Sequence, residues 1–143
     1  MKQQTHTLKL ATQKDIPEVV DLLHRLFNSS VYQSQTQFKR LDVIDNLERL
    51  LQRPADGLVL CLTYEENTVG VLVASHMRHL FNEKEKTAVE LGFYIKEEHK
   101  TLATMKLMLQ AYRYWARLQK CTSIMMGKMK DSTSIETYSL RRL

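Results

Sequence analysis

The chain has 143 residues, of which 43% are hydrophobic and 26% are charged. This length is typical of one domain with a core of its own, and the composition excludes a disordered chain. Gly and Pro number only 4 and 2, which excludes long flexible linkers and low-complexity tracts. The sequence therefore predicts a single domain over residues 1–143.

The sequence also indicates where the protein resides. No apolar run is long enough for a transmembrane helix, and the amino-terminal stretch lacks the apolar segment of a secretory signal. Cys61 and Cys121 lie far apart in apolar stretches. A disulfide between them is arithmetically possible, but buried free thiols in a reducing compartment are favoured. We expect a cytoplasmic protein without a membrane partner.

The net charge of +5 is unevenly distributed. Residues 1–70 carry 8 basic and 9 acidic side chains, whereas residues 71–143 carry 13 and 7. A basic second half suits an anionic ligand such as a phosphorylated cofactor, an acidic protein surface or nucleic acid, and a solvated surface is the alternative. Nucleic acid is the least favoured ligand, because the basic residues between 96 and 120 follow ordinary helix-surface spacing.

The first half of the chain predicts a strand and two helices. Alternating residues indicate a strand over residues 5–11. A helix follows, with Asp15 placed to cap it, Pro17 in its first turn and Glu18 at the capping-box position. Its apolar face ends before Asn28-Ser29-Ser30. A polar loop then leads into a second helix over residues 41–52.

The second half predicts most of the sheet. The nearly continuous apolar run 57–64 indicates a strand buried on both faces, which pairs with residues 68–75 in a hairpin. Residues 87–96 alternate as another strand, with one face formed by Ala88, Glu90, Gly92 and Tyr94.

A long helix over residues 101–119 joins that strand to a strand over 123–129, and this connection predicts that the two strands are parallel. A short last strand is expected over residues 136–140. The order predicts an α/β (α+β mixed) fold in which a central mixed sheet of about six strands is flanked by three helices.

This order resembles the GNAT superfamily of acetyl-CoA-dependent N-acetyltransferases. The likeness lies in the segment Leu8–Pro17, the hairpin around Val69-Gly70-Val71, and the strand Val89–Ile95 with the turn after it. Residues 111–121 resemble bacteriophage members most. The resemblance covers about residues 5–130, and it implies a GNAT-like fold, acetyl-CoA as cofactor and an amine as acceptor.

The family holds the pyrophosphate of acetyl-CoA at a small-residue turn, where backbone N–H groups and the dipole of the central helix favour an anion. The matching segment here begins at Lys100 and includes the small Ala103, but it has no glycine, and Met105 stands where Gly or Ala is expected. The motif is therefore degenerate, and an ordinary helix cap beside a lysine is the alternative. The resemblance implies cofactor contacts from Phe93, Tyr94, Ile95, His99, Lys100, Thr101, Leu102, Ala103 and Thr104.

Glu90 is the candidate catalytic residue. It lies in mid-strand among apolar neighbours, where an acid is unusual. The resemblance implies that it accepts the proton of the acceptor amine, directly or through water. A solvent-facing or ion-paired glutamate is the alternative. We expect no metal site, since His76 and His79 lack further ligands nearby.

The carboxy-terminal segment departs from the family. Residues 130–143 are too few for the usual helix and hairpin, which predicts a shortened C-terminus with a loop at 131–134 and one closing strand. The customary tyrosine acid has no counterpart, and Tyr138 is a poor substitute. An uncovered edge strand favours association, and Ile124, Met126 and Leu140 would be partly exposed in a monomer. We therefore expect a homo-oligomer or a larger assembly.

Two functions remain open from the sequence. The first is an N-acetyltransferase that binds acetyl-CoA between the fourth and fifth strands and acts on an amine of unknown identity. The second is a catalytically inactive GNAT-fold structural or interaction protein, for example a phage virion or assembly component. Glu90 and Lys100 favour the first, whereas the glycine-free turn and the missing terminal helix favour the second.

Overall fold

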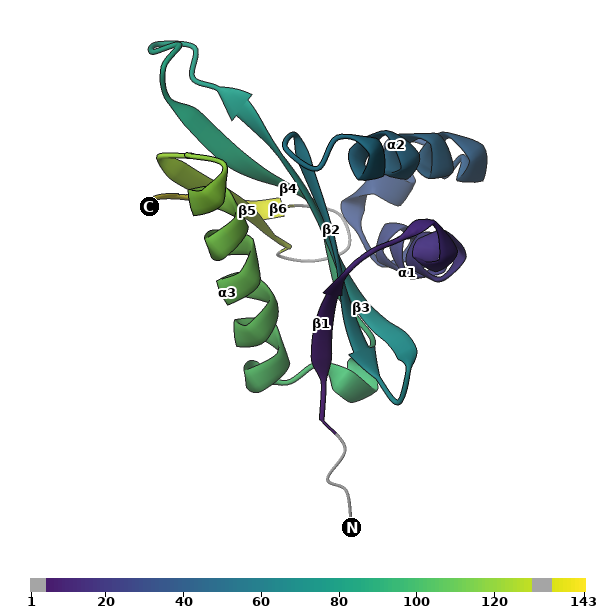
Figure 1. Cartoon of the computed structure of the whole chain (residues 1–143). Helices are drawn as coiled ribbons and strands as arrows, with labels where there is room; N and C mark the ends of the chain where they lie inside the picture. Colours follow the sequence, from purple (N-terminus) through teal and green to yellow (C-terminus); the bar gives the residue numbers. More distant parts are fainter. Residues whose placement is uncertain (1–4, 130–134) are drawn as a thin grey trace.

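Six strands form one sheet in which spatial order follows chain order (Figure 1). The computed structural model describes the backbone of residues 5–129 and 135–143. It describes the side chains of residues 5–127 and 141–143. All neighbouring strands are antiparallel except β4 and β5, which are parallel as expected. The strands are β1 (Thr7–Leu10), β2 (Gly57–Tyr64), β3 (Asn67–Arg78), β4 (Lys86–Ile95), β5 (Ser123–Met129) and β6 (Ile135–Arg142).

Three α-helices cover the two faces of this sheet. Figure 1 shows α1 (Ile16–Asn28) and α2 (Arg40–Gln52) on one face and α3 (Leu102–Leu118) on the other. The predicted α/β fold with six strands and three helices is confirmed. The segment expected as a loop after α1 contains a 3-10 turn, Val31–Ser34, which begins where the Ser30 hydroxyl accepts a hydrogen bond from the Tyr32 N–H.

The sheet separates two apolar cores. Leu60 and Leu62 of β2 pack with Met108 and Tyr112 of α3, whereas Cys61 packs against α1 and α2. This two-sided burial explains the continuous apolar run of β2 and confirms its prediction. Both cysteines are buried free thiols, and Cys121 lies in the α3 core on the opposite side of the sheet from Cys61.

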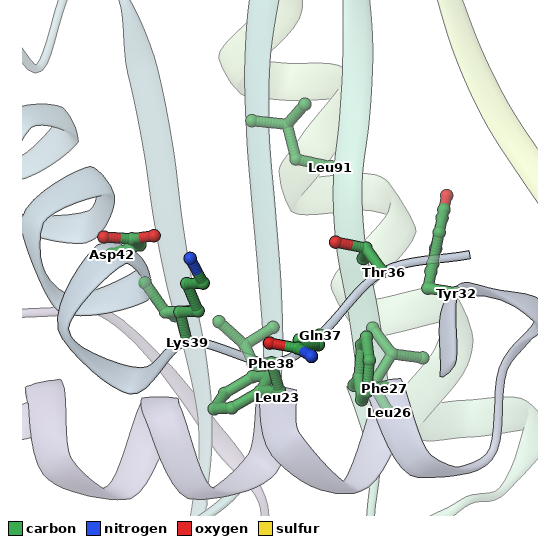
Figure 2. Close-up of a pocket in the computed structure, with 11 residues that line it drawn as sticks. Leu23, Leu26, Phe27, Tyr32, Thr36, Gln37, Phe38, Lys39, Asp42 and Leu91 are labelled. Carbon is green, nitrogen blue, oxygen red and sulfur yellow. The ribbon is translucent and has the colours of Figure 1, made fainter. Parts of the chain in front are cut away.

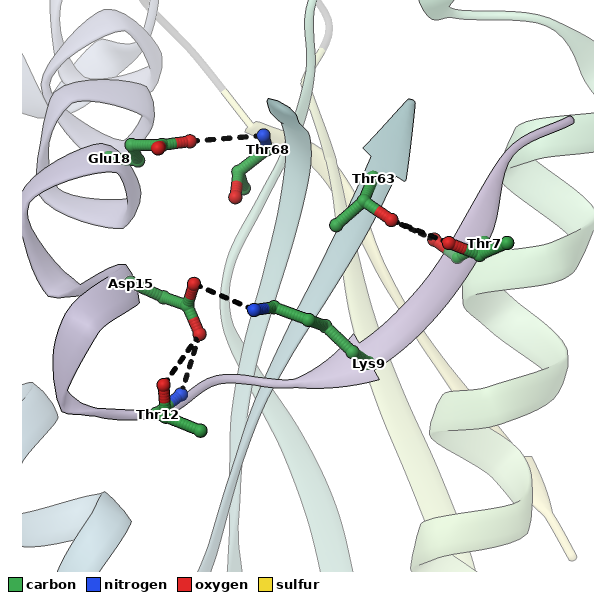
Figure 3. Close-up of polar contacts among 7 residues, drawn as sticks. All are labelled: Thr7, Lys9, Thr12, Asp15, Glu18, Thr63 and Thr68. Carbon is green, nitrogen blue, oxygen red and sulfur yellow. Dashed lines mark hydrogen bonds and ion pairs between the residues drawn. The ribbon is translucent and has the colours of Figure 1, made fainter. Parts of the chain in front are cut away.

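The start of α1 differs from its prediction. The Asp15 carboxylate does not cap α1; it accepts hydrogen bonds from the N–H and hydroxyl of Thr12, at 2.7 and 3.1 Å, and pairs with Lys9 Nζ at 2.8 Å (Figure 3). Glu18 accepts instead from the N–H of Thr68, at 3.0 Å. The cause is a 3-10 turn, Gln13–Asp15, which precedes α1 and has Thr12 as its own cap.

The alternation predicted for β4 fails at Leu91. Glu90 pairs with Ala74 and Gly92 pairs with Val73, so Leu91 is an extra residue without a partner on β3. Such a bulge reverses which face each later residue occupies. Phe93 therefore packs in the α3 core, and a Cβ on Gly92 would lie 3.1 Å from Leu23 of α1. The expectation that Glu90 shares a face with Gly92 and Tyr94 is wrong.

Two smaller expectations also change, and others fall outside the described residues. Ile124 is only 5% exposed because α3 covers it, so it is not an exposed edge residue. His76 lies within β3 rather than after it, and its Nε2 is 2.9 Å from the carbonyl oxygen of Ala55. The predicted loop at 131–134 and the side chains of Tyr138 and Leu140 lie outside the described residues.

Among the described helices, none has the length and apolar character needed to span a bilayer.

Candidate active site

The candidate site lies where β4 and β5 diverge. The two strands pair only between Thr87–Val89 and Ser123–Met125. Beyond these residues β4 stays paired with β3, and β5 stays paired with β6. From Glu90 to Ile95, the other edge of β4 thus has no strand partner in the described part of the chain. Backbone groups on an open edge need partners, and a ligand is one way to supply them.

A cleft of about 690 Å³ opens at this divergence. Its volume is in the range of small-molecule sites. It is bounded by β4, by the end of α1 and the turn after it, by the segment that leads into α3, and by β5. The lining residues include Leu26, Ser29, Ser30, Tyr32, Glu90, Phe93, Tyr94, Ile95, Glu97, Lys100, Met105 and Gly127.

Glu90 is the half-buried carboxylate of this cleft. Its Oε2 accepts a hydrogen bond from the backbone N–H of Gly127 at 3.2 Å. Burial raises the pKa of Glu90, and the Gly127 hydrogen bond opposes this rise only in part. A carboxylate with a raised pKa is a stronger base than an exposed one, and such a group in a cleft marks a functional candidate.

A buried phenol lies behind Glu90. Tyr112 is fully buried, and its hydroxyl donates to the carbonyl oxygen of Met125 at 3.0 Å. Burial and the charge of Glu90 raise the pKa of Tyr112, so the phenol stays protonated. Because Tyr112 has no access to solvent, it supports the β5 backbone opposite Glu90 and does not reach a ligand.

The turn that opens α3 caps itself. The N–H of Thr104 donates to the hydroxyl of Thr101 at 3.1 Å, and the N–H of Thr101 donates to the hydroxyl of Thr104 at 2.9 Å. The N–H of Met105 already bonds to the carbonyl oxygen of Thr101. Within this described turn, the N–H groups of Leu102 and Ala103 have no protein acceptor. They remain as anion donors at the positive end of the helix.

The structure brings only some of the sequence-predicted residues together. Glu90, Phe93, Tyr94, Ile95 and Lys100 line one cleft. The others do not line it: His99 borders a separate cavity of about 440 Å³, where its Nδ1 is hydrogen-bonded to His6 Nε2 at 3.0 Å. The remaining four form the capped first turn of α3, in which Leu102 is 72% exposed; they are Thr101, Leu102, Ala103 and Thr104.

Solved structures of acetyltransferases have this arrangement of strands and helices. An aminoglycoside 6′-N-acetyltransferase from Acinetobacter haemolyticus shares 16% identity over 82% of this chain and 76% of its own, with a TM-score of 0.67. A predicted acetyltransferase from Clostridium acetobutylicum, solved with acetyl-CoA, shares 10% identity over 84% of this chain and 79% of its own, with a TM-score of 0.69. An aminoglycoside N-acetyltransferase solved with CoA shares 10% identity over 86% of this chain and 76% of its own, with a TM-score of 0.71.

The chain has the GNAT acetyltransferase fold. No protein-family model matches the sequence. No curated protein sequence matches it either.

Sequence reasoning missed a second pocket on this GNAT fold. A cavity of about 610 Å³ lies between α1, α2 and the segment that joins them, and it contains Tyr32, Phe38 and Leu91 (Figure 2). The joining segment was predicted only as a polar loop, because it has no periodicity to indicate a buried side. Its two aromatic residues, Tyr32 and Phe38, were the available signal.

Proposed function

We propose that this protein is an N-acetyltransferase that transfers an acetyl group from acetyl-CoA to an amine. The observation that carries the proposal is the cleft between β4 and β5, into which the half-buried Glu90 is set. The likeness to folds solved with acetyl-CoA and with CoA supports it.

The residues of the cleft fit acetyl-CoA. The open edge of β4 from Phe93 to Ile95 offers backbone groups to the amide-containing arm of the molecule. Lys100, with the free N–H groups of Leu102 and Ala103, offers positive charge for its phosphates. His99 lies next to this turn and would act there only as a supporting contact. When bound, acetyl-CoA supplies an acetyl group activated as a thioester.

Glu90 would act as the general base. The nitrogen of the acceptor attacks the thioester carbonyl carbon, so that a C–N bond forms and the C–S bond breaks. The sulfur leaves with the bonding electron pair and becomes the thiol by taking a proton from water, and Glu90 later returns to water the proton that it accepted. The proton lost by the amine goes to the Glu90 carboxylate, directly or through one water, and general-base help of this kind gives about 10²–10⁴ in rate.

A catalytically inactive structural or interaction protein with this fold, such as a phage virion or assembly component, is the second candidate. Two observations favour it. The Thr101 hydroxyl already occupies the N–H of Thr104, and Met105 lines the cleft where a small residue was expected. A phosphate would find fewer free donors here than at a glycine-rich turn. The oligomer or assembly expected from the sequence belongs to either candidate.

Titration calorimetry with acetyl-CoA and with CoA distinguishes the two candidates. An acetyltransferase binds both ligands, and the addition of an amine to the acetyl-CoA complex releases free CoA thiol. Dephospho-CoA lacks only the 3′-phosphate of CoA, and pantetheine lacks only the phosphate of 4′-phosphopantetheine, so a loss of affinity within either pair locates a phosphate contact. Absence of binding by both acetyl-CoA and CoA would support the inactive structural or interaction protein.

A further inference from the structure

The pocket beside the cleft has a predominantly apolar lining. Figure 2 shows side chains of α1 along its floor and Leu91 of β4 opposite them. Phe38 forms part of the wall, and it is held in place because its ring stacks on His24 with centroids 4.2 Å apart and lies 5.6 Å from the ring of Phe27. The apolar lining residues are Leu23, Leu26, Phe27, Phe38, Val43 and Leu91.

The pocket adjoins the cleft that contains Glu90. Both cavities share Leu26, Tyr32 and Leu91 as lining residues. The bulge of β4 is the reason for this geometry, since the extra residue Leu91 faces the pocket while its neighbour Glu90 bonds across to β5. Because Leu91 directly follows Glu90 and lines both cavities, the apolar pocket lies within reach of the substituent on a nitrogen held in the cleft beside Glu90.

The charges of the pocket do not suit a polycation. Among its described lining residues, the only ones charged at neutral pH are one acid, Asp42, and one base, Lys39, so their formal charges cancel. The large apolar side chain of Leu91 is 56% exposed. Exposed apolar surface in a concave site is typical of ligand-binding pockets. An apolar group that covers Leu91 and lies along Phe38 would lose water contact on both sides.

We propose that the acceptor is a primary amine carried on an apolar body about the size of one ring, and not a polycation such as an aminoglycoside. This proposal rests on the proposed N-acetyltransferase function. It separates this protein from the aminoglycoside acetyltransferases that share its fold.

The test compares acceptors in the full chain with saturating acetyl-CoA. 2-Phenylethylamine is the apolar probe, and kanamycin and spermidine are the polycationic probes, each followed by release of CoA thiol. We expect kcat/KM for 2-phenylethylamine to exceed that for either polycation by at least about tenfold, since one buried ring is worth that much in differential binding. A preference for kanamycin or spermidine overturns the proposal.

Two matched leucine variants locate the acceptor. Leu91→Gln places an amide in the pocket, and Leu118→Gln makes the same change at a leucine of α3 that is 59% exposed and does not line it. We expect Leu91→Gln to raise the KM for 2-phenylethylamine about fivefold or more at nearly unchanged kcat, and Leu118→Gln to leave both within twofold. Equal effects of the two variants overturn the assignment.

Calorimetry keeps the proposal testable if turnover is slow. 2-Phenylethylamine is titrated into the CoA complex of the wild type and of Leu91→Gln. Binding to the first and weaker binding to the second support the apolar acceptor, whereas no binding to the wild-type complex overturns it. If CoA and acetyl-CoA themselves do not bind, it is the proposed function that fails, and the two failures are therefore distinguishable.

Discussion

The Glu90 carboxylate and the Gly127 N–H, joined at 3.2 Å, form the only described side-chain hydrogen bond between β4 and β5 beyond the last residues that the two strands pair. The bond closes one end of the opening between the strands. It also holds the carboxylate inside the cleft rather than in solvent. Glu90 thus makes a structural contact and is also placed to accept a proton. The melting temperature tests the first role, and the rate of acetyl transfer tests the second.

Replacement of Glu90 by Gln should remove the base and keep the contact. A glutamine Oε1 can still accept from the Gly127 N–H, so we expect the melting temperature to change little. Acetyl transfer should fall about 100-fold or more in kcat, because a general base contributes about 10²–10⁴. Glu97→Gln is the control, since Glu97 lines the same cleft but is exposed. Turnover that persists in Glu90→Gln would place the base elsewhere.

The pH dependence of stability should show that Glu90 is held in a buried site. Burial raises its pKa in the folded chain, so ionisation costs the folded state more than the unfolded one. We therefore compare the unfolding free energy of the wild type with that of Glu90→Gln. This difference should fall as pH rises from about 4.3, the pKa of glutamate in the unfolded chain, through the raised pKa of the folded chain, and then level off. Urea unfolding of both proteins between pH 4 and 8 measures this difference. A flat or rising difference would contradict it.

The sequence predicted the element order well, because apolar periodicity is a local property. It could not predict the bulge, since Leu91 continues the alternation in sequence and becomes an extra residue only in register with β3. The same is true of Asp15 and Glu18, whose partners Lys9 and Thr68 depend on where β1 and β3 lie. Five of the ten candidate site residues line the cleft, because four of them lie in β4 itself and Lys100 ends the turn after it. The pocket between α1 and α2 depends on how a non-periodic segment packs.

Charge reversal at Lys100 should weaken acetyl-CoA binding. Lys100 lines the cleft and precedes the first turn of α3, so Lys100→Glu places a negative charge where we propose the phosphates lie. We expect an affinity loss of about tenfold at low salt, which shrinks as ionic strength rises because Lys100 is exposed. Lys106→Glu, an equal charge change on the exposed side of α3, should have a smaller effect. Calorimetry at two salt concentrations checks this, and equal losses would contradict the phosphate assignment.

Asp15 should stabilise the junction of β1 and α1. Burial raises its pKa, but hydrogen bonds from Lys9 and Thr12 outweigh burial, and the pKa is lowered overall. Its stabilisation is therefore present above the unfolded-state value of about 3.9 and is lost as pH falls through the lowered folded pKa. We expect Asp15→Asn to lower the unfolding free energy at pH 7 by about 1–3 kcal/mol.

The matched control for Asp15 is Asp21→Asn. Asp21 pairs with Arg40 at 2.9 Å, but its side chain is 67% exposed, against 12% for Asp15. An exposed pair contributes about 0–1 kcal/mol, so this variant should stay near the wild type. Urea unfolding at pH 7 and pH 3 compares the three proteins. If Asp15→Asn is as stable as Asp21→Asn at pH 7, the burial of the carboxylate has no energetic consequence.

Removal of residues 135–143 should make the protein associate. β6 pairs with β5 along its whole length and forms the edge of the sheet, so this deletion leaves the N–H and C=O groups of β5 that face β6 without partners. An open edge strand is a template for pairing with another chain. We expect the full chain to sediment as a dimer or larger assembly through the β6 edge, and the truncated chain to form larger, heterogeneous species. Removal of residues 1–4 is the control, because it leaves all six strands intact. A truncated chain that sediments as a soluble monomer would contradict this prediction, and it would show that α3 and the rest of the sheet protect β5 without β6.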